Sequence, residues 1–492
     1  MSTVVNLNES PQALDGPEQD LPVRFLTAAS LFDGHDASIN IMRRIMQDRG
    51  AEVIHLGHNR GVQEIVRGAL QEDVDGIAIS SYQGGHVEYF KYMVELLREA
   101  GAGHIRVFGG GGGVIVPEEI RELETAGVEK IYSPEDGRQL GLDGMIDDLI
   151  ERTRRARRAI EPDRLELSVE RHFDLGQMIS LIEQSAEQEG TRSLRDGLTL
   201  PAKPAPILGI TGPGGSGKSS LTDELLNRFL AAFPTMKLAV LSIDPTKRRT
   251  GGALLGDRIR MNSLASDRIF MRSMATRRSH LATNTMLEDC IALLQSVGFD
   301  LIIVETAGIG QSGSEIVDFV DKSLYVMTCE YGAASQLEKI DMIDYADFIA
   351  LNKFEKRGAD DALRDIRKQW RRSRKAFELA DEAVPVFPTI ASQFNDAGVN
   401  WLFAQLCESI GGLEGKADFS WSLEDGWKER EALTRRALIP SKRQRYLSEI
   451  SEHGRDMRAQ THSQGELASR LQGLFGSLKA LGDTSLPAQL EA

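Results

Sequence analysis

The chain has 492 residues, which is too long for one ordinary core and suits two or three domains. Of these residues, 41% are hydrophobic. Acidic residues outnumber basic ones by 73 to 58, and the net charge of -15 argues against a protein that binds nucleic-acid backbones. Three cysteines without paired spacing predict neither disulfides nor a cysteine metal site, and no stretch is apolar enough to span a membrane. We therefore expect a cytoplasmic protein with no nucleic-acid or membrane partner.

Residues 1–20 are polar and acidic and are predicted to be a disordered tail. Residues 21–153 are predicted to form an α/β domain, because short apolar runs alternate with amphipathic stretches. The runs are 25–29, 53–56, 76–79, 105–108 and 128–132. Such a series folds as an open, mostly parallel sheet covered by helices on both faces, with ligands beyond the carboxyl ends of the strands.

Residues 154–205 begin with arginines, continue with scattered leucines and end with prolines, which predicts a helical linker. Residues 206–415 are predicted to form a second α/β domain. Its expected strands are 207–211, 238–243, 301–304, 324–327 and 348–351. Residues 416–492 are charged and helix-prone and are predicted to be a helical extension.

Residues 212–219 read Gly-Pro-Gly-Gly-Ser-Gly-Lys-Ser and match the P-loop pattern, with a β-rich run before them and an amphipathic stretch after them. Glycines let backbone N–H groups wrap phosphates. The alternative interpretation is a glycine-rich turn that precedes a helix without binding phosphate. Lys218 is expected on the β and γ phosphates and the Ser219 hydroxyl on Mg²⁺. The predicted nucleotide contacts are Gly214, Gly215, Ser216, Gly217, Lys218, Ser219 and Ser220.

Two later segments are placed to complete a nucleotide site. The apolar run 301–304 delivers Glu305, where the Walker B carboxylate that holds the metal belongs. Asn352-Lys353-Phe354-Glu355 resembles the Asn-Lys-x-Asp element by which GTPases read guanine, and Ser392 is expected to line the base. Glu355 stands where that element has aspartate, and its extra methylene shifts the carboxylate. How strictly the site selects GTP over ATP therefore stays open.

Two further carboxylates, Asp244 and Asp257, follow a strand beside the P-loop. With the run Glu-Thr-Ala-Gly-Ile-Gly-Gln-Ser at 305–312, they resemble the G-protein chaperones of cobalamin-dependent acyl-CoA mutases. The resemblance implies that Gln311 positions the attacking water beside Lys218 and Glu305, and that residues 331–339 signal to the mutase. It also implies a nucleotide contact from Arg260 and a magnesium site of Ser219, Asp244, Asp257, Glu305 and Thr306.

Residues 33–38 read Asp-Gly-His-Asp-Ala-Ser and resemble the Asp-x-His-x-x-Gly motif of cobalamin-binding domains in the methylmalonyl-CoA mutase group, with Ser38 in place of the last glycine. A neutral His35 can ligate cobalt while Asp33 accepts the other ring N–H. The cofactor's displaced dimethylbenzimidazole tail then needs a slot between small residues. Predicted cofactor contacts are Asp33, His35, Ser38, Ser80, Tyr82, Gly84, Gly85, Gly109, Gly110 and Gly111.

The alternative for this loop is that His35 caps a helix and the glycines form a flexible turn. His86 is ambiguous, since it fits a contact with the cofactor's edge as well as a cap.

A cobalamin domain followed by this G domain resembles fused isobutyryl-CoA mutases. That resemblance implies adenosylcobalamin, GTP/GDP and Mg²⁺ as ligands, and an oligomer. The family's (β/α)₈ substrate barrel takes about 250 residues, whereas the residues after 412 look helical. We therefore expect a GTPase that isomerises an acyl-CoA only with a large acyl-CoA-binding mutase subunit, either a separate chain or a missing domain. The alternatives are a stand-alone GTP-dependent cobalamin-delivery chaperone and a nucleotide-regulated module whose flavodoxin-like domain binds another ligand.

Overall fold

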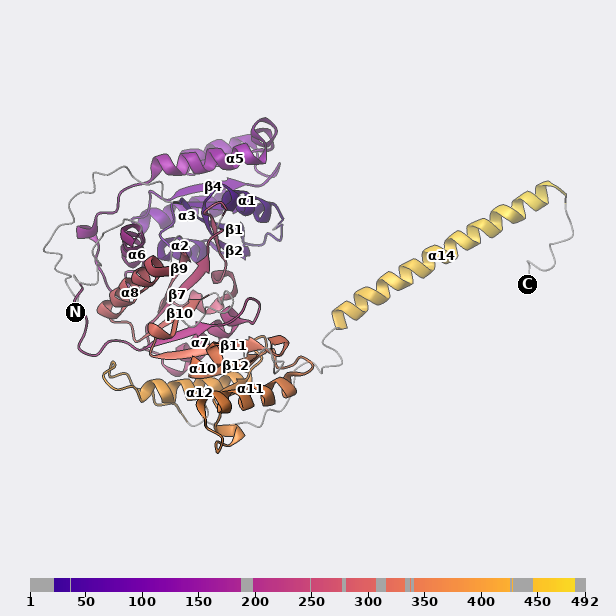
Figure 1. The fold of residues 1–492 in the computed structure, drawn as a ribbon. Helices are drawn as coiled ribbons and strands as arrows, with labels where there is room; N and C mark the ends of the chain where they lie inside the picture. The colour runs from indigo at the N-terminus through magenta and orange to yellow at the C-terminus, as the bar shows by residue number, and fades with distance from the viewer. Residues whose placement is uncertain are drawn as a thin grey trace. The chain divides into compact units, whose positions relative to one another are not determined.

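The computed structural model describes residues 22–482 apart from 36, 187–197, 248, 277–279, 307–315, 332–336, 338–339, 425–426 and 428–445. The chain divides into two compact units, residues 1–430 and 431–492. The first unit contains two parallel sheets, each the centre of an α/β domain (Figure 1).

The first domain is a doubly wound sheet. Its strands are β1 (Arg24–Ser30), β2 (Glu52–Arg60), β3 (Gly76–Ser80), β4 (Arg106–Gly110) and β5 (Lys130–Tyr132). Its helices are α1 (Ala37–Asp48), α2 (Val62–Gln71), α3 (His86–Glu99), α4 (Pro117–Ala126) and α5 (Pro134–Ala156). The order β5-β4-β3-β1-β2 is the flavodoxin-like order, whose ligand crevice lies where β1 meets β3. The predicted fold class is confirmed, and the loops after β1 and β3 lie at that switch point.

Side chains that alternate along β1 fill two separate cores. Leu26 belongs to the core that includes residues of α2, α3 and α4, whereas Phe25 belongs to the core that includes residues of α1 and α5. The helices therefore cover both faces of the sheet, and its carboxyl edge is left for the loops that carry the predicted cofactor residues.

The second domain is a seven-stranded parallel sheet in the order β13-β12-β11-β6-β10-β7-β9. Its strands are β6 (Ile207–Thr211), β7 (Leu238–Pro245), β9 (Ile269–Thr276), β10 (Leu301–Thr306), β11 (Lys322–Thr328), β12 (Phe348–Asn352) and β13 (Val386–Pro388). Two hydrophobic cores enclose the sheet, one on each face. One core includes residues of α7 (Lys218–Ala232) and α12 (Ala397–Gly411). The other includes residues of α8 (His280–Val297), α10 (Met342–Tyr345) and α11 (Ala359–Arg374). Short 3-10 helices, among them η3 (Arg258–Arg260), η4 (Asn262–Ala265) and η6 (Cys329–Tyr331), lie in the connections.

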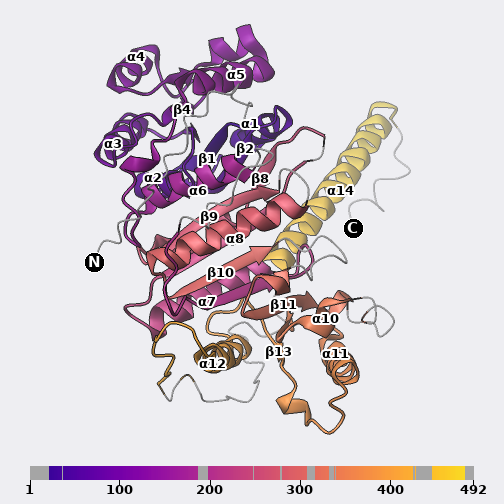
Figure 2. The ribbon, with the colours of Figure 1, turned by 60° about the vertical axis from the view of Figure 1, so that its left-hand side comes forward.

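Part of the predicted linker packs into the second domain. Residues 172–186 form α6 (His172–Ala186), and its Leu175 and Ile179 are fully buried in the same core as Leu294 of α8. Helices α6 and α8 lie side by side in both ribbon views (Figure 2). In the second unit, α14 (Tyr446–Ala480) agrees with the predicted helical extension. None of the described helices is long and apolar enough to cross a membrane.

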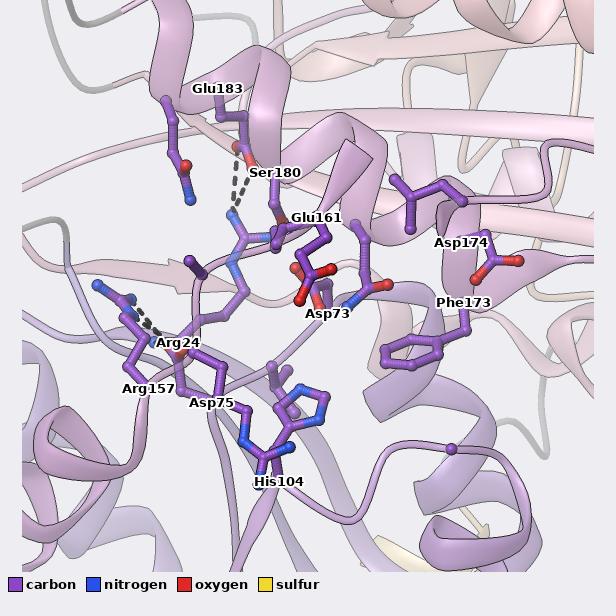
Figure 3. A pocket seen from close by; sticks show the side chains of 18 of the residues that line it. Arg24, Asp73, Asp75, His104, Arg157, Glu161, Phe173, Asp174, Ser180 and Glu183 are labelled. Carbon is purple, nitrogen blue, oxygen red and sulfur yellow. Dashed lines mark hydrogen bonds and ion pairs between the residues drawn. The ribbon is translucent and has the colours of Figure 1, made fainter. Parts of the chain in front are cut away.

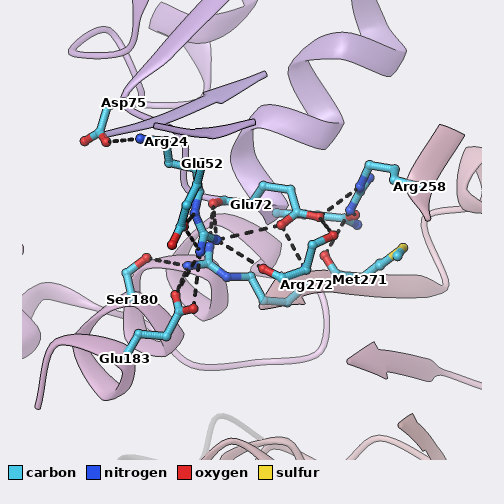
Figure 4. A network of polar contacts seen from close by, with 11 residues as sticks. Arg24, Glu52, Glu72, Asp75, Ser180, Glu183, Arg258, Met271 and Arg272 are labelled. Atoms are coloured by element: carbon cyan, nitrogen blue, oxygen red, sulfur yellow. Dashed lines mark hydrogen bonds and ion pairs between the residues drawn. The ribbon is translucent and has the colours of Figure 1, made fainter. Parts of the chain in front are cut away.

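The two domains share a strand that the sequence did not reveal. The three-residue strand β8 (Ala253–Leu255) comes from the second domain but pairs in parallel with Glu52–Ile54 of β2. It is therefore the edge strand of the first domain's sheet. Beside it, six buried charged side chains from both domains form one network of ion pairs and hydrogen bonds (Figure 4). They are Arg24, Glu52, Glu72, Glu183, Arg258 and Arg272.

A polar pocket of about 410 Å³ lies next to this network (Figure 3). It is lined by Arg24 at the start of β1, by Asp75 just before β3 and by Arg157 after α5. The Arg157 guanidinium pairs with Asp75 at 2.8 Å. Since Arg24 begins β1 and Asp75 precedes β3, the pocket lies at the amino ends of these strands, opposite the edge that carries the predicted cofactor loops.

Candidate functional sites

The loop after β1 holds His35 by one ring nitrogen. His35 Nδ1 and the His35 backbone N–H both lie within 2.9 Å of Asp33 Oδ1, while Asp33 Oδ2 accepts the Tyr82 backbone N–H at 2.6 Å. The Asp33 side chain is fully buried and the His35 ring is 75% exposed. Burial raises the pKa of Asp33, but the hydrogen bonds from the His35 and Tyr82 backbone outweigh it and hold that pKa below its ordinary value. The carboxylate therefore orients the ring, and Nε2 is the nitrogen on the opposite side of it.

The loop after β3 lies against the His35 loop. The Tyr82 and His35 rings are 5.3 Å apart, and the Ser38 and Ser80 hydroxyls are 3.2 Å apart. Ser38, in the first turn of α1, therefore contacts the last residue of β3 directly, although it replaces a glycine of the motif. This geometry does not resemble a helix cap, because the His35 ring bonds to Asp33 in its own loop.

Gly109 in β4 and Gly111 just after it serve packing as well as any ligand. A Cβ at Gly109 would lie 2.4 Å from the Phe90 ring, and one at Gly111 would lie 1.9 Å from the Ser81 carbonyl oxygen. A Cβ at Gly84, in contrast, would meet open space, and one at Gly85 or Gly110 would lie no closer than 3.1 Å to a neighbouring atom. Gly109 and Gly111 are therefore required because other parts of the protein pack closely against them. There is room for a ligand beside Gly84.

His86 has a structural role in this chain. It is 2% exposed, with Nδ1 2.9 Å from the Gln83 carbonyl oxygen and Nε2 2.9 Å from Glu119 Oε2. Both ring nitrogens are therefore engaged within the protein at the start of α3, although the ring does not cap the helix, and the geometry supports a structural role for His86 over a contact with the cofactor.

The P-loop connects β6 to α7 as its pattern predicts. Gly215 and Gly217 have φ of 78° and 92°, a region that favours glycine. A Cβ at Gly212 would lie 2.0 Å from the Val326 carbonyl oxygen, and one at Gly217 2.3 Å from Asn352 Nδ2. Lys218 Nζ donates to the Gly212 carbonyl oxygen at 2.8 Å, which holds the ammonium over the loop. Burial lowers the pKa of Lys218, opposed by the charges of Glu305 and Asp257.

Two carboxylates meet at the Ser219 hydroxyl, which lies 2.7 Å from Asp257 Oδ1 and 3.0 Å from Glu305 Oε1. Burial, together with the charge of Asp257, raises the pKa of Glu305 to about 8 and that of Asp244 to about 7. Asp244 Oδ2 is buried and has no hydrogen-bond partner among the residues that the structure describes. Buried, mutually repelling carboxylates are the kind of oxygen ligands that a divalent cation stabilises.

Among the described residues, no three His, Cys, Asp or Glu side chains lie close enough together to hold a metal by themselves. The magnesium site of Ser219, Asp244, Asp257, Glu305 and Thr306 expected from the sequence stays a prediction. Mg²⁺ usually takes one or two carboxylates together with phosphate oxygens and water, and Ser219, Asp257 and Glu305 fit that arrangement. The Thr306 hydroxyl donates to the Thr211 hydroxyl at 3.0 Å.

Other predicted residues are less well placed or lie outside the described part. The Arg260 guanidinium is 62% exposed and 3.7 Å from Asp257. Gln311 and most of 331–339 fall in the ranges that the structure leaves out. Two hydroxyls that were not predicted from the sequence hold the carboxylates: Thr222 donates to Glu305 Oε2 at 3.0 Å and Ser242 donates to Asp257 Oδ2 at 2.7 Å. Thr222 lies one helical turn after Lys218, a spacing that could have pointed to it.

The segment expected to read the base contacts the P-loop. Asn352 donates to the Ser216 carbonyl oxygen at 2.8 Å and accepts the Ala391 backbone N–H at 3.1 Å, which also fixes the loop that carries Ser392. Lys353 Nζ donates to the Gly215 carbonyl oxygen at 2.8 Å. Glu355 and Ser392 are exposed at this edge. The structure thus gathers the two loops expected to bind the base next to the loop expected to bind the phosphates.

Two family models match the two domains. One, described as B12 binding domain, matches residues 23–136. The other, described as methylmalonyl Co-A mutase-associated GTPase MeaB, matches residues 175–418. The GTPase domain of this chain belongs to the MeaB family. The MeaB match begins inside α6, in keeping with the packing of that helix in the GTPase core.

The chain is homologous to fused isobutyryl-CoA mutases over most of its length. The protein of that name from Geobacillus kaustophilus is 51% identical over 467 residues, and the one from Cupriavidus metallidurans is 53% identical over 471 residues. These alignments cover 93% and 94% of this chain but only 42% of each relative. The GTPase ArgK of Escherichia coli is 33% identical over 147 residues, 30% of this chain and 44% of that protein. The chain thus joins a B12-binding domain to a MeaB-type GTPase domain and spans less than half the length of the fused mutases.

Proposed function

We propose that this chain is the cobalamin-binding and GTPase-chaperone subunit of an adenosylcobalamin-dependent acyl-CoA mutase. The observation that carries the proposal is the pairing of a B12-binding domain with a MeaB-type GTPase domain, at about half identity to fused mutases over nearly the whole chain. The substrate-binding part would come from a separate subunit or from a part of the protein beyond this sequence, since more than half of those relatives has no counterpart here.

In the B12-binding domain, the His35 loop would provide the lower cobalt ligand. Asp33 would accept a hydrogen bond from Nδ1–H, which would fix the tautomer and leave Nε2 as the ligating nitrogen. The open space beside Gly84 would receive part of the cofactor. Adenosylcobalamin would supply the homolytic cobalt–carbon cleavage that starts the radical isomerisation.

In the GTPase domain, Lys218 and the P-loop N–H groups would bind the β and γ phosphates of GTP, with Ser219, Asp257 and Glu305 around Mg²⁺. Lys218 would exchange its bond to the Gly212 carbonyl for the phosphates. GTP binding and hydrolysis would gate cobalamin loading and the removal of damaged cofactor, in the way that γ-phosphate contacts order switch segments in other GTPases.

Reconstitution tests the proposal. The purified chain is mixed with candidate (β/α)₈ barrel chains and adenosylcobalamin, and acyl-CoA isomerisation is assayed by separating the two isomeric thioesters. We expect isomerisation only when both chains and the cofactor are present. Failure to form a complex with any barrel chain would rule out the split-mutase arrangement.

A second candidate function is a stand-alone chaperone that delivers cobalamin to an independently complete mutase. The MeaB description as a mutase-associated GTPase favours it. In that case the loaded chain would release cobalamin to the acceptor when GTP is hydrolysed, and it would not add to the acceptor's turnover once loading is complete.

A further inference from the structure

One continuous segment of the GTPase domain contributes to both domains. Its strand β8 extends the sheet of the B12-binding domain by pairing with β2. Just before it, a Cβ at Gly252 would lie 2.2 Å from the Gln47 carbonyl oxygen, so the segment is packed directly on α1. Two residues after β8, Asp257 accepts the Ser219 hydroxyl of the P-loop helix. A shift of this segment at the nucleotide site would therefore also displace its contacts with the B12-binding domain.

Beyond Asp257, the segment contacts an irregular part of β2, residues 57–60, which we call the β2 bulge. The pairing of β1 with β2 loses its regular register here. Gly57 has φ of 88°, and a Cβ at this position would lie 2.8 Å from Ile259 Cδ1. The Ile259 carbonyl oxygen also accepts the Arg60 guanidinium at 3.4 Å. Ile259 thus contacts the bulge through both its side chain and its backbone.

The other side of the β2 bulge contacts the His35 loop. Asn59 has φ of 57°, a left-handed conformation that asparagine tolerates. Its Oδ1 accepts the Phe32 backbone N–H at 2.8 Å. Phe32 directly precedes Asp33, whose carboxylate holds the His35 ring. A single hydrogen bond therefore connects the bulge to the start of the loop that carries the cobalt ligand.

We propose that the β2 bulge is the relay between the two ligand sites, with Ile259 and Asn59 as the positioning residues on its two sides. The proposal rests on the cobalamin and GTP sites of the proposed function. A nucleotide with Mg²⁺ competes for the Ser219 hydroxyl and the Asp257 carboxylate, which now bond to each other. Asp257 then changes position, Ile259 follows two residues later, and the packed bulge transmits the shift to Phe32. Small displacements are transmitted in this way because tightly packed contacts do not deform gradually.

The test compares the dissociation constant of adenosylcobalamin, measured by absorbance titration, in saturating Mg²⁺ with GDP or with a non-hydrolysable GTP analogue. The ratio of the two constants measures coupling, and about 5-fold or more is expected for the wild type. Asn59→Gly keeps the left-handed backbone and removes the acceptor, and Ile259→Ala removes the contact with Gly57. We expect both variants to bind each ligand alone and to bring the ratio close to one.

Two variants serve as controls. Asn59→Asp restores an oxygen acceptor for Phe32 and should restore the wild-type ratio. Lys375→Gly replaces another left-handed residue, at the end of α11, and should leave the ratio unchanged. Hydrogen exchange of the Phe32 amide should differ between the two nucleotides in the wild type and not in Ile259→Ala.

The relay is refuted if Asn59→Gly and Ile259→Ala keep the wild-type ratio. A wild-type ratio of one would instead contradict the gating part of the proposed function, and the relay with it. A chain that binds no cobalamin under either condition would contradict the cobalamin site itself, so the three failures can be told apart.

Discussion

The Arg258 guanidinium donates to the Glu72 carboxylate at 3.1 Å across the boundary between the two domains. Their side chains are 5% and 0% exposed. Glu72 also accepts the backbone N–H and the hydroxyl of Ser273 on β9. Arg258 directly follows Asp257, so the segment that contacts the P-loop serine is anchored in the other domain one residue later.

Removal of the Glu72 charge is expected to destabilise the protein strongly. Glu72→Gln leaves Arg258 and Arg24 without one of their buried partners. Breaking a buried ion pair by removing one partner costs about 3–5 kcal/mol. Urea denaturation measures the loss in the free energy of unfolding. Glu118→Gln, which removes an exposed pair with Arg121, is the control and should cost less than about 1 kcal/mol. Equal effects of the two substitutions would contradict the account of the network.

His35→Ala should change the absorbance spectrum of bound cobalamin, because the spectrum depends on the lower axial ligand. Asp33→Asn should weaken cobalamin binding, since one amide oxygen cannot accept both the His35 ring N–H and the Tyr82 backbone N–H as the two carboxylate oxygens do. Changes to a group that orients a metal-binding histidine typically cost about 10–100-fold in metal affinity. His462→Ala, an exposed histidine on α14, is the control. An unchanged spectrum for His35→Ala would refute the assignment of the cobalt ligand.

Lys218→Ala should abolish most GTP hydrolysis. The ammonium lies over the P-loop within 2.8 Å of the Gly212 carbonyl oxygen, and removal of one charge-stabilising donor commonly costs about 10²–10³-fold in rate. Phosphate release measures the rate. Lys203→Ala, which removes an exposed pair with Asp418, should retain wild-type hydrolysis. Hydrolysis by Lys218→Ala at the wild-type rate would show that the nucleotide is hydrolysed elsewhere.

The stability of the protein should fall on mild acidification because of His172. Burial lowers the pKa of His172 to about 4, from an ordinary value of 6.5. Between these values the unfolded chain binds a proton that the folded chain does not, so the free energy of unfolding decreases as the pH falls through this window, by up to about 3 kcal/mol. His172→Gln should reduce this slope, measured by urea denaturation at pH 7, 6 and 5. The same slope in both proteins would contradict the prediction.

Much of the candidate site could be predicted because its residues are contiguous. The P-loop at 212–219 and the Asp33–His35 motif are each read from a few neighbouring residues, and the strands before them have clear apolar runs. The expected run 207–211 coincides with β6. Such sites can be predicted from local patterns because the strand and the loop that follows it are adjacent both in the sequence and in the fold.

The parts that escaped prediction depend on partners far away in the sequence. β8 is only three residues long and pairs with residues some 200 positions earlier. Strand β9 was not predicted, because the charged Arg272 interrupts its apolar run. In the fold this charge is paired with Glu183. Asn59 looks like an ordinary loop residue, and only the fold shows that it contacts Phe32.

We propose that one chain binds both cobalamin and GTP and that the nucleotide controls the cobalamin site. The most direct measurement is a titration of the purified chain with adenosylcobalamin, followed by absorbance, with Mg²⁺ and either GDP or a non-hydrolysable GTP analogue. We predict binding of one cobalamin per chain, with dissociation constants that differ at least about 5-fold between the two nucleotides. Absence of cobalamin binding, or identical constants with both nucleotides, would contradict the account.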